Sequence, residues 1–273
     1  MKKIYLLIVL AIISGMAVSC KNRTKENNAE ANTEVVEAAK IILADDVMAT
    51  IDGLSGDFIK SCGNSDISAI FTSALTEEEK LARPDYFMAP SKANEWLTNN
   101  QKIYGLSYLV IDLQFYHAYG LPTEDVEAAI AKLVADLNFP ISIDDMKNKT
   151  LSEKVRAVYN DVKEKGEIEI FWKFAVGTMT EFEYIISQNP DPFFRNVTSE
   201  QLANVYHRYS DCVKAIKELA NYDEEIATAY NTISENALTL FNADFTDVNS
   251  LKSAMSSKEW KDATAAHREA LLK

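Results

Sequence analysis

Two helical stretches with apolar side chains on nearly every face constrain the fold of this chain most. Residues 104–119 and 170–186 place apolar or aromatic groups all round a helix of 3.6 residues per turn. A helix without a polar face cannot lie at a protein surface, so other helices must enclose it. We therefore expect two central helices inside a larger bundle.

The rest of the chain reads mainly as amphipathic helix, which suits an outer layer. No run alternates apolar and polar residues as a strand would, and the sequence holds only eight glycines. These features predict an all-α fold, a single bundle of eight or nine helices. Helical stretches are expected over 34–60, 66–74, 76–81, 91–119, 123–137, 151–165, 167–188, 199–220, 224–241 and 249–272. Gly53 and Gly56 should interrupt the first of these, and Thr76 and Thr123 should cap two of the others.

The first twenty residues resemble a bacterial lipoprotein signal. Lys2 and Lys3 precede an apolar run over 4–13, and small residues lead to Cys20. The run is shorter than the roughly 20 apolar residues that a permanent membrane span needs. We expect residues 1–19 to be removed and Cys20 to be lipidated. The alternative is an ordinary secretory signal cut near Ser19, with Cys20 left as an unmodified thiol.

A polar tether should separate the lipid from the folded domain. Residues 20–33 lack large apolar side chains and cannot bury enough surface to offset the entropy of ordering. Residues 34–273 then form one helical domain, because no second linker of similar polarity follows. We expect a membrane-anchored protein of the cell envelope, held in the outer membrane and facing the periplasm.

The charge balance excludes one class of partner. The formal net charge is -13, and no cluster of basic residues interrupts it. Such a surface repels phosphate backbones, so we expect no nucleic acid. The expected partners are the membrane, through the lipid anchor, and an unknown protein or small molecule. Cys62 and Cys212 either form a disulfide or remain two separate buried thiols.

Each central stretch carries a carboxylate where water should be scarce. Asp112 lies in the first and Glu181 in the second. In one interpretation both accept hydrogen bonds and fix the helix packing. In the other they face each other across a pocket, as an acid–base pair or as an anchor for a ligand. The neighbouring residues that such a ligand site would use are Tyr108, Tyr116, Thr178 and Tyr184.

Enzyme signatures are largely absent from the sequence. It contains no zinc-protease, dinucleotide-binding, phosphate-loop or calcium-loop motif, so we expect no cofactor and no metal. The favoured hypothesis is a non-catalytic helical module that binds a partner. An alternative is an acid–base hydrolase or lyase that uses Asp112 and Glu181, and a further alternative is a purely structural envelope protein.

The segment Asn189–Arg195 is a second candidate for contact with a partner. Two prolines stiffen it, and Phe193 and Phe194 follow them. Recognition loops often have this composition. The alternative interpretation, which we favour, is that both rings fold back onto the core.

Three segments resemble an uncharacterised family of all-helical lipoproteins from Bacteroidetes. They are SYLVIDLQF at 107–115, KLVADL at 132–137 and GTMTEFEY at 177–184. The family's patterns are GVYxADLxY, KLADxLGI and GxWIEGLY, and the match spans residues 101–188. Leu109 and Phe115 stand where the family has Tyr, and Met179 stands where it has Trp. The resemblance implies the helical fold and draws attention to Asp112 and Glu181, and it carries no activity.

Overall fold

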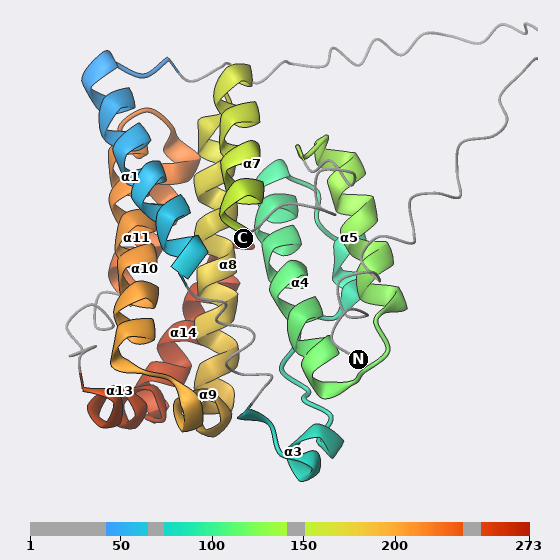
Figure 1. Ribbon diagram of the computed structural model, residues 1–273. Helices are drawn as coiled ribbons and strands as arrows, with labels where there is room; N and C mark the ends of the chain where they lie inside the picture. Colours follow the sequence, from blue (N-terminus) through green and yellow to red (C-terminus); the bar gives the residue numbers. More distant parts are fainter. Residues whose placement is uncertain (1–41, 65–73, 141–150, 237–246) are drawn as a thin grey trace, which may run out of the picture.

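The computed structural model describes residues 42–64, 74–140, 151–236 and 247–273 (Figure 1). Within these ranges the chain forms eleven α-helices and one 3-10 helix and no strand, which confirms the all-α prediction. The signal over 1–19, Cys20, the tether over 20–33 and most of the short helix expected over 66–74 lie outside the described residues.

The helices follow one another with short connections. The N-terminal half contains α1 (Asp45–Asn64), α3 (Glu77–Leu81), η3 (Pro90–Asn94), α4 (Asn99–Tyr119) and α5 (Glu124–Leu137). The C-terminal half contains α7 (Leu151–Lys165), α8 (Ile168–Gln188), α9 (Pro190–Asn196), α10 (Ser199–Leu219), α11 (Glu224–Asn236), α13 (Val248–Met255) and α14 (Lys258–Ala270).

The number of helices exceeds the eight or nine predicted, for identifiable local reasons. The stretch 249–272 is two helices, because Ser257 caps α14 by accepting a hydrogen bond from the backbone N–H of Trp260. The expected loop after Asn189 is the short helix α9, with Pro190 in its first turn, where proline is tolerated. The predicted interruption of α1 is wrong, since the helix continues through Gly53 and Gly56.

Capping signals in the sequence were read correctly at two helix starts. Thr76 and Glu79 form the predicted reciprocal capping box at α3. Thr123 is the N-cap residue of α5, although its hydroxyl donates to Glu127 Oε1 at 2.9 Å and caps no backbone N–H. Gly120 ends α4 in the left-handed conformation, with φ of 66°, which glycine adopts without steric cost.

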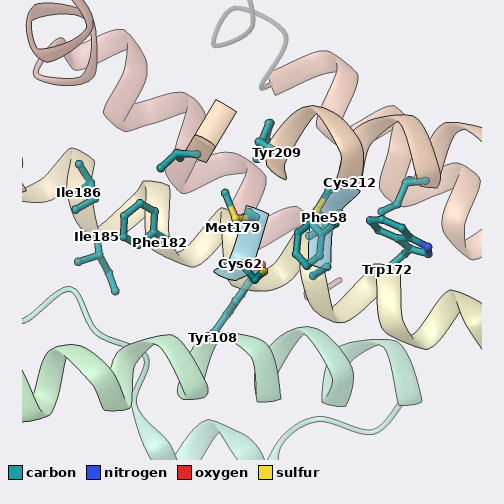
Figure 2. Packing of buried hydrophobic residues seen from close by; sticks show 14 of the residues in the cluster. Phe58, Cys62, Tyr108, Trp172, Met179, Phe182, Ile185, Ile186, Tyr209 and Cys212 are labelled. Carbon is teal, nitrogen blue, oxygen red and sulfur yellow. The ribbon is translucent and has the colours of Figure 1, made fainter. Parts of the chain in front are cut away.

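Helix α4 lies between two apolar clusters. The larger cluster surrounds α8 and includes Tyr108 and Trp172, and the smaller one joins α4 to α5 through Leu109 and Leu133. Figure 2 shows part of the larger cluster, where Trp172, Phe182 and Ile185 of α8 pack among side chains of other helices. Because both sides of α4 meet apolar neighbours, its apolar residues extend round most of its circumference.

Two further expectations meet the structure in the core. Cys62 and Cys212 are both buried and free, so they are separate thiols and form no disulfide. Phe193 and Phe194 are buried, which agrees with the interpretation that they fold back onto the core. Their rings pack edge to face, with centroids 5.1 Å apart.

The contact between α4 and α8 depends on a glycine. A Cβ atom placed on Gly177 would lie 1.9 Å from Ser107 Oγ and 2.9 Å from Ser107 Cβ. The Ser107 hydroxyl is itself held by a 2.6 Å hydrogen bond to the carbonyl of Tyr104. Glycine is therefore required here because the two helices approach closely.

Gly177→Ala is expected to lower the free energy of unfolding by about 1 to 3 kcal/mol, since overpacking outweighs the gain in helix propensity. Gly53→Ala is the matched control, because that glycine is exposed in α1 and has no atom within 4 Å of an added Cβ. The control should gain up to about 1 kcal/mol. Urea unfolding of both variants measures the difference, and equal gains in both would refute the close contact.

Candidate functional site

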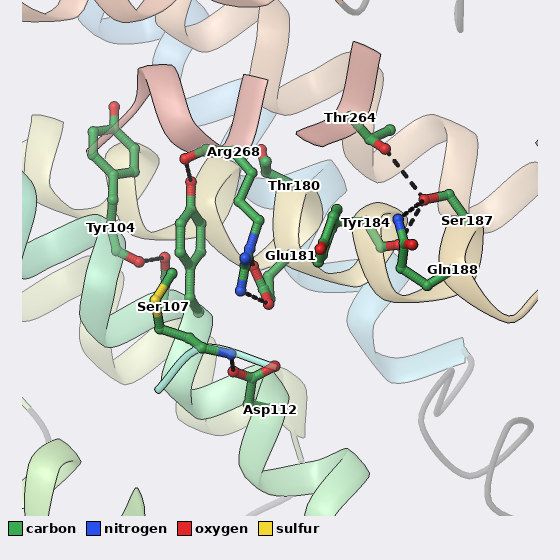
Figure 3. A network of polar contacts seen from close by, with 12 residues as sticks. Tyr104, Ser107, Asp112, Thr180, Glu181, Tyr184, Ser187, Gln188, Thr264 and Arg268 are labelled. Atoms are coloured by element: carbon green, nitrogen blue, oxygen red, sulfur yellow. Dashed lines mark hydrogen bonds and ion pairs between the residues drawn. The ribbon is translucent and has the colours of Figure 1, made fainter. Parts of the chain in front are cut away.

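Asp112 of α4 and Glu181 of α8 meet in the interior of the bundle (Figure 3). Both residues are 0% exposed, and their carboxyl groups are in side-chain hydrogen-bond contact. Two carboxylates can share such a bond only when one of them carries a proton. The two acids that the sequence singled out therefore form one buried acidic pair.

Arg268 of α14 supplies the positive charge that the pair requires. Its Nε donates to Glu181 Oε2 at 2.5 Å, and its Nη2 donates to Glu181 Oε1 at 2.7 Å. This two-point geometry is the strong form of an ion pair between arginine and carboxylate. The side chain of Arg268 is only 13% exposed, so solvent screens the pair weakly.

Two tyrosines hold the guanidinium group of Arg268 in place. It lies 4.3 Å from the ring centre of Tyr184 and 5.5 Å from that of Tyr108, which are cation–π contacts. The hydroxyl of Tyr108 also donates to the backbone carbonyl of Arg268 at 3.0 Å. Side chains of α4 and α8 thus fix both the head group and the backbone of one residue of α14.

The segment between α3 and η3 contacts Asp112 directly. The backbone N–H of Met88 donates to Asp112 Oδ2 at 2.8 Å. Nearby, the hydroxyl groups of Tyr86 and Tyr119 lie 3.3 Å apart, and Phe87 packs its ring against Tyr119. This segment joins the acidic pair to a third part of the chain.

Asp112 is the member of the pair that holds the proton. Burial, followed by the charge of Glu181, raises the pKa of Asp112 well above its ordinary value, and Arg268 offsets only part of this. Asp112 Oδ1 is buried and has no donor among the described residues, so nothing opposes a proton there. With Asp112 neutral, the charges of Glu181 and Arg268 cancel and the cluster is neutral.

The remaining residues that the sequence suggested lie at the margin of this cluster. Tyr116 is half-buried, and its ring centre lies 5.1 Å from that of Phe87. Thr178 is also half-buried, and its hydroxyl donates to the carbonyl of Ala175 within α8 at 2.7 Å. The structure therefore joins Tyr108 and Tyr184 to the acidic pair through Arg268, whereas Thr178 makes only a local bond.

An open hollow of about 400 Å³ adjoins the cluster, between the end of α8 and the start of α14. Tyr184 is shared, because it lines this hollow and also contacts Arg268. Lys258 is hydrogen-bonded to Asp262 at the rim. Lys261 has no ion-pair partner in the described ranges. The residues that line the hollow are Tyr184, Gln188, Ser256, Lys258, Lys261, Asp262 and Ala265.

Sequence reasoning missed Arg268 and Met88. The signal for Arg268 was indirect: a buried carboxylate needs a cation, and the chain holds few arginines. Nothing in the spacing selects the arginine nearest the C-terminus, which is 87 residues from Glu181. Met88 contributes only its backbone, which no side-chain pattern reveals.

The described part of the chain holds no group of three or more His, Cys, Asp or Glu residues placed to bind a metal. None of the described helices is both long and apolar enough to cross a bilayer. Comparison with protein-family models, curated proteins and solved structures finds no match to this chain. The resemblance drawn from the three sequence segments therefore stays a prediction.

Asp112→Asn is expected to remove a pH dependence of stability. The folded chain keeps a proton on Asp112 that the unfolded chain releases above pH about 4, so the free energy of unfolding falls as pH rises, by up to about 1.4 kcal/mol per pH unit. Asn keeps the shape of the protonated acid without titrating. The variant should therefore gain stability relative to wild type between pH 5 and pH 8, as measured by urea unfolding.

Glu181→Gln is the contrasting variant, because it leaves the Arg268 guanidinium buried without its counterion. Its loss should be about 3 kcal/mol at pH 7. If the Asp112→Asn curve instead runs parallel to wild type across this pH range, Asp112 is ionised in the fold and the protonation assigned here is wrong.

Proposed function

We propose that this chain is a lipid-tethered, non-catalytic binding protein of the cell envelope, and that the open hollow beside Tyr184 is its ligand site. The observation that supports this is the position of Tyr184, which lines the hollow and contacts the buried Arg268. The ligand would then bind against a wall whose side chains are already held by the interior of the bundle. Such preorganisation lowers the entropy cost of binding.

The lining favours a small anionic ligand, such as a carboxylate. Lys258 and Lys261 stand against the single acid Asp262, so the hollow carries one excess positive charge. The chain as a whole carries 41 acidic against 28 basic residues, so this local excess runs against the general composition. Ser256, Gln188 and the hydroxyl of Tyr184 add groups able to form hydrogen bonds with the polar part of such a ligand.

In this proposal α4 and α8 are the central pair of the bundle, and their acids support the site without contacting ligand. Membrane attachment is assigned to Cys20, at the start of the tether. The outer membrane facing the periplasm is the expected location. A purely structural envelope protein is the alternative that remains when the hollow binds nothing.

An acid–base enzyme that uses Asp112 and Glu181 is the second candidate. The raised pKa of Asp112, caused by burial and by the adjacent carboxylate, is the property that favours it. A general acid or base must, however, come within hydrogen-bond reach of its substrate. Both carboxyls are fully buried, and neither lines either of the two hollows described for this chain. We therefore assign the pair a supporting role.

Calorimetric titration with citrate at constant ionic strength tests the ligand site. We expect weak binding to wild type and about tenfold weaker binding to Lys261→Gln, since a charge-assisted hydrogen bond is lost. Lys217→Gln, which removes an exposed lysine of α10, should bind as wild type does. Absence of binding to wild type argues against an anion site, and equal binding to both variants places the anion elsewhere.

Cys20→Ser tests the tether. The protein should move from the detergent-extracted membrane fraction to the soluble fraction of the envelope, because the acceptor of the lipid is lost. Immunoblotting of the two fractions is the measurement. Retention of the variant in the membrane fraction would contradict attachment through Cys20.

A further inference from the structure

A second, smaller hollow lies near the end of the bundle where α9, α13 and α14 meet (Figure 1). Its volume of about 20 Å³ is enough for one group the size of a water molecule. Seven apolar side chains from α8, α9, α10, α13 and α14 line it, together with one carboxyl group, that of Glu183. Three of the seven are aromatic: Phe182, Phe193 and Trp260.

Glu183 and Trp260 both bring polar groups to this hollow that have no partner. Glu183 is 8% exposed and has neither a hydrogen-bond nor an ion-pair partner in the part of the chain that the structure describes. The indole Nε1 of Trp260 is buried and likewise unpaired. A polar group buried without a partner costs about 1 to 3 kcal/mol, so natural proteins rarely keep one unless something else completes it.

The electrostatic environment of Glu183 has a single cause. Burial alone raises its pKa to about 8, and no charged group contributes. The nearest titratable neighbour is Tyr209 of α10, whose pKa is raised by burial and by Glu183. Glu183 thus lacks the kind of counterion that Arg268 provides for Glu181.

We propose that this hollow binds the ammonium group of a small primary amine, with Glu183 as its anion. A carboxylate surrounded by aromatic rings is the arrangement that recognises organic cations, because the ring faces attract positive charge while the acid neutralises it. The size of the hollow selects a primary amine, since an NH₃⁺ group is about as large as a water molecule and a quaternary ammonium group is much larger. The apolar lining suits the carbon chain of the amine.

Binding by this route releases a proton. The neutral Glu183 acid gives its proton to the buffer as the ammonium ion takes its place, so charge is conserved within the hollow. At pH 7 close to one proton should leave for each amine bound. A water molecule in the hollow would hydrogen-bond to the neutral acid and release none, so proton release separates the two occupants.

Thermal unfolding of the intact chain with n-butylammonium chloride tests the proposal. At ten times the dissociation constant the Tm should rise by about 3 to 6 °C. Tetramethylammonium chloride and n-butanol at the same concentrations should have no effect, the first because of its size and the second because it has no charge. The site is refuted if wild type shows no rise, or if tetramethylammonium gives the same rise.

Glu183→Gln should abolish the rise, whereas Glu259→Gln should keep it. Glu259 is the matched control because it is exposed on α14, next to Trp260 in the sequence. An equal rise in both variants would overturn the assignment of Glu183. If Glu183→Gln does not fold, calorimetry of wild type in two buffers of different ionisation enthalpy decides, because binding without proton release contradicts the proposal. This site is separate from the hollow beside Tyr184, so either can fail without the other.

Discussion

The buried ion pair between Glu181 and Arg268 is the interaction on which the arrangement of this bundle depends. It joins the last helix to α8, and through the proton shared with Asp112 it also joins both to α4. Each charged group would be costly to bury alone, so none of the three can keep its position without the others. The pair therefore fixes how the C-terminal helix sits against the core, which apolar packing by itself specifies only loosely.

This constraint reaches the surface through Tyr184. The ring contacts the guanidinium of Arg268 on the interior side and lines the open hollow between α8 and α14. A helix whose backbone and side chain are both tied to the core offers a rigid wall, whereas a helix held by apolar contacts alone can shift. The same end of α8 also carries Glu183, which has no such cation. Two acids two residues apart in sequence thus have opposite environments.

The sequence predicted much of the fold because the helical signals are local. Apolar periodicity located the long helices, and Thr76 and Thr123 marked two of their starts. The errors are also local in origin: Gly53 and Gly56 lie on an exposed part of α1, where the loss of propensity is small, and Ser257 divides what periodicity reads as one helix. Proline was read as a loop signal at Pro190, where it begins a short helix.

For the candidate site, the sequence alone singled out Asp112, Glu181, Tyr108 and Tyr184, because polar groups in an otherwise apolar helix attract attention wherever the helix lies. Only the tertiary structure decided what these groups do. The partner of Glu181 comes from the far end of the chain, and the donor to Asp112 is a backbone N–H. Proximity between distant segments, and the proton that it forces two carboxyls to share, depend on how the helices pack in three dimensions, which no periodicity in the sequence encodes.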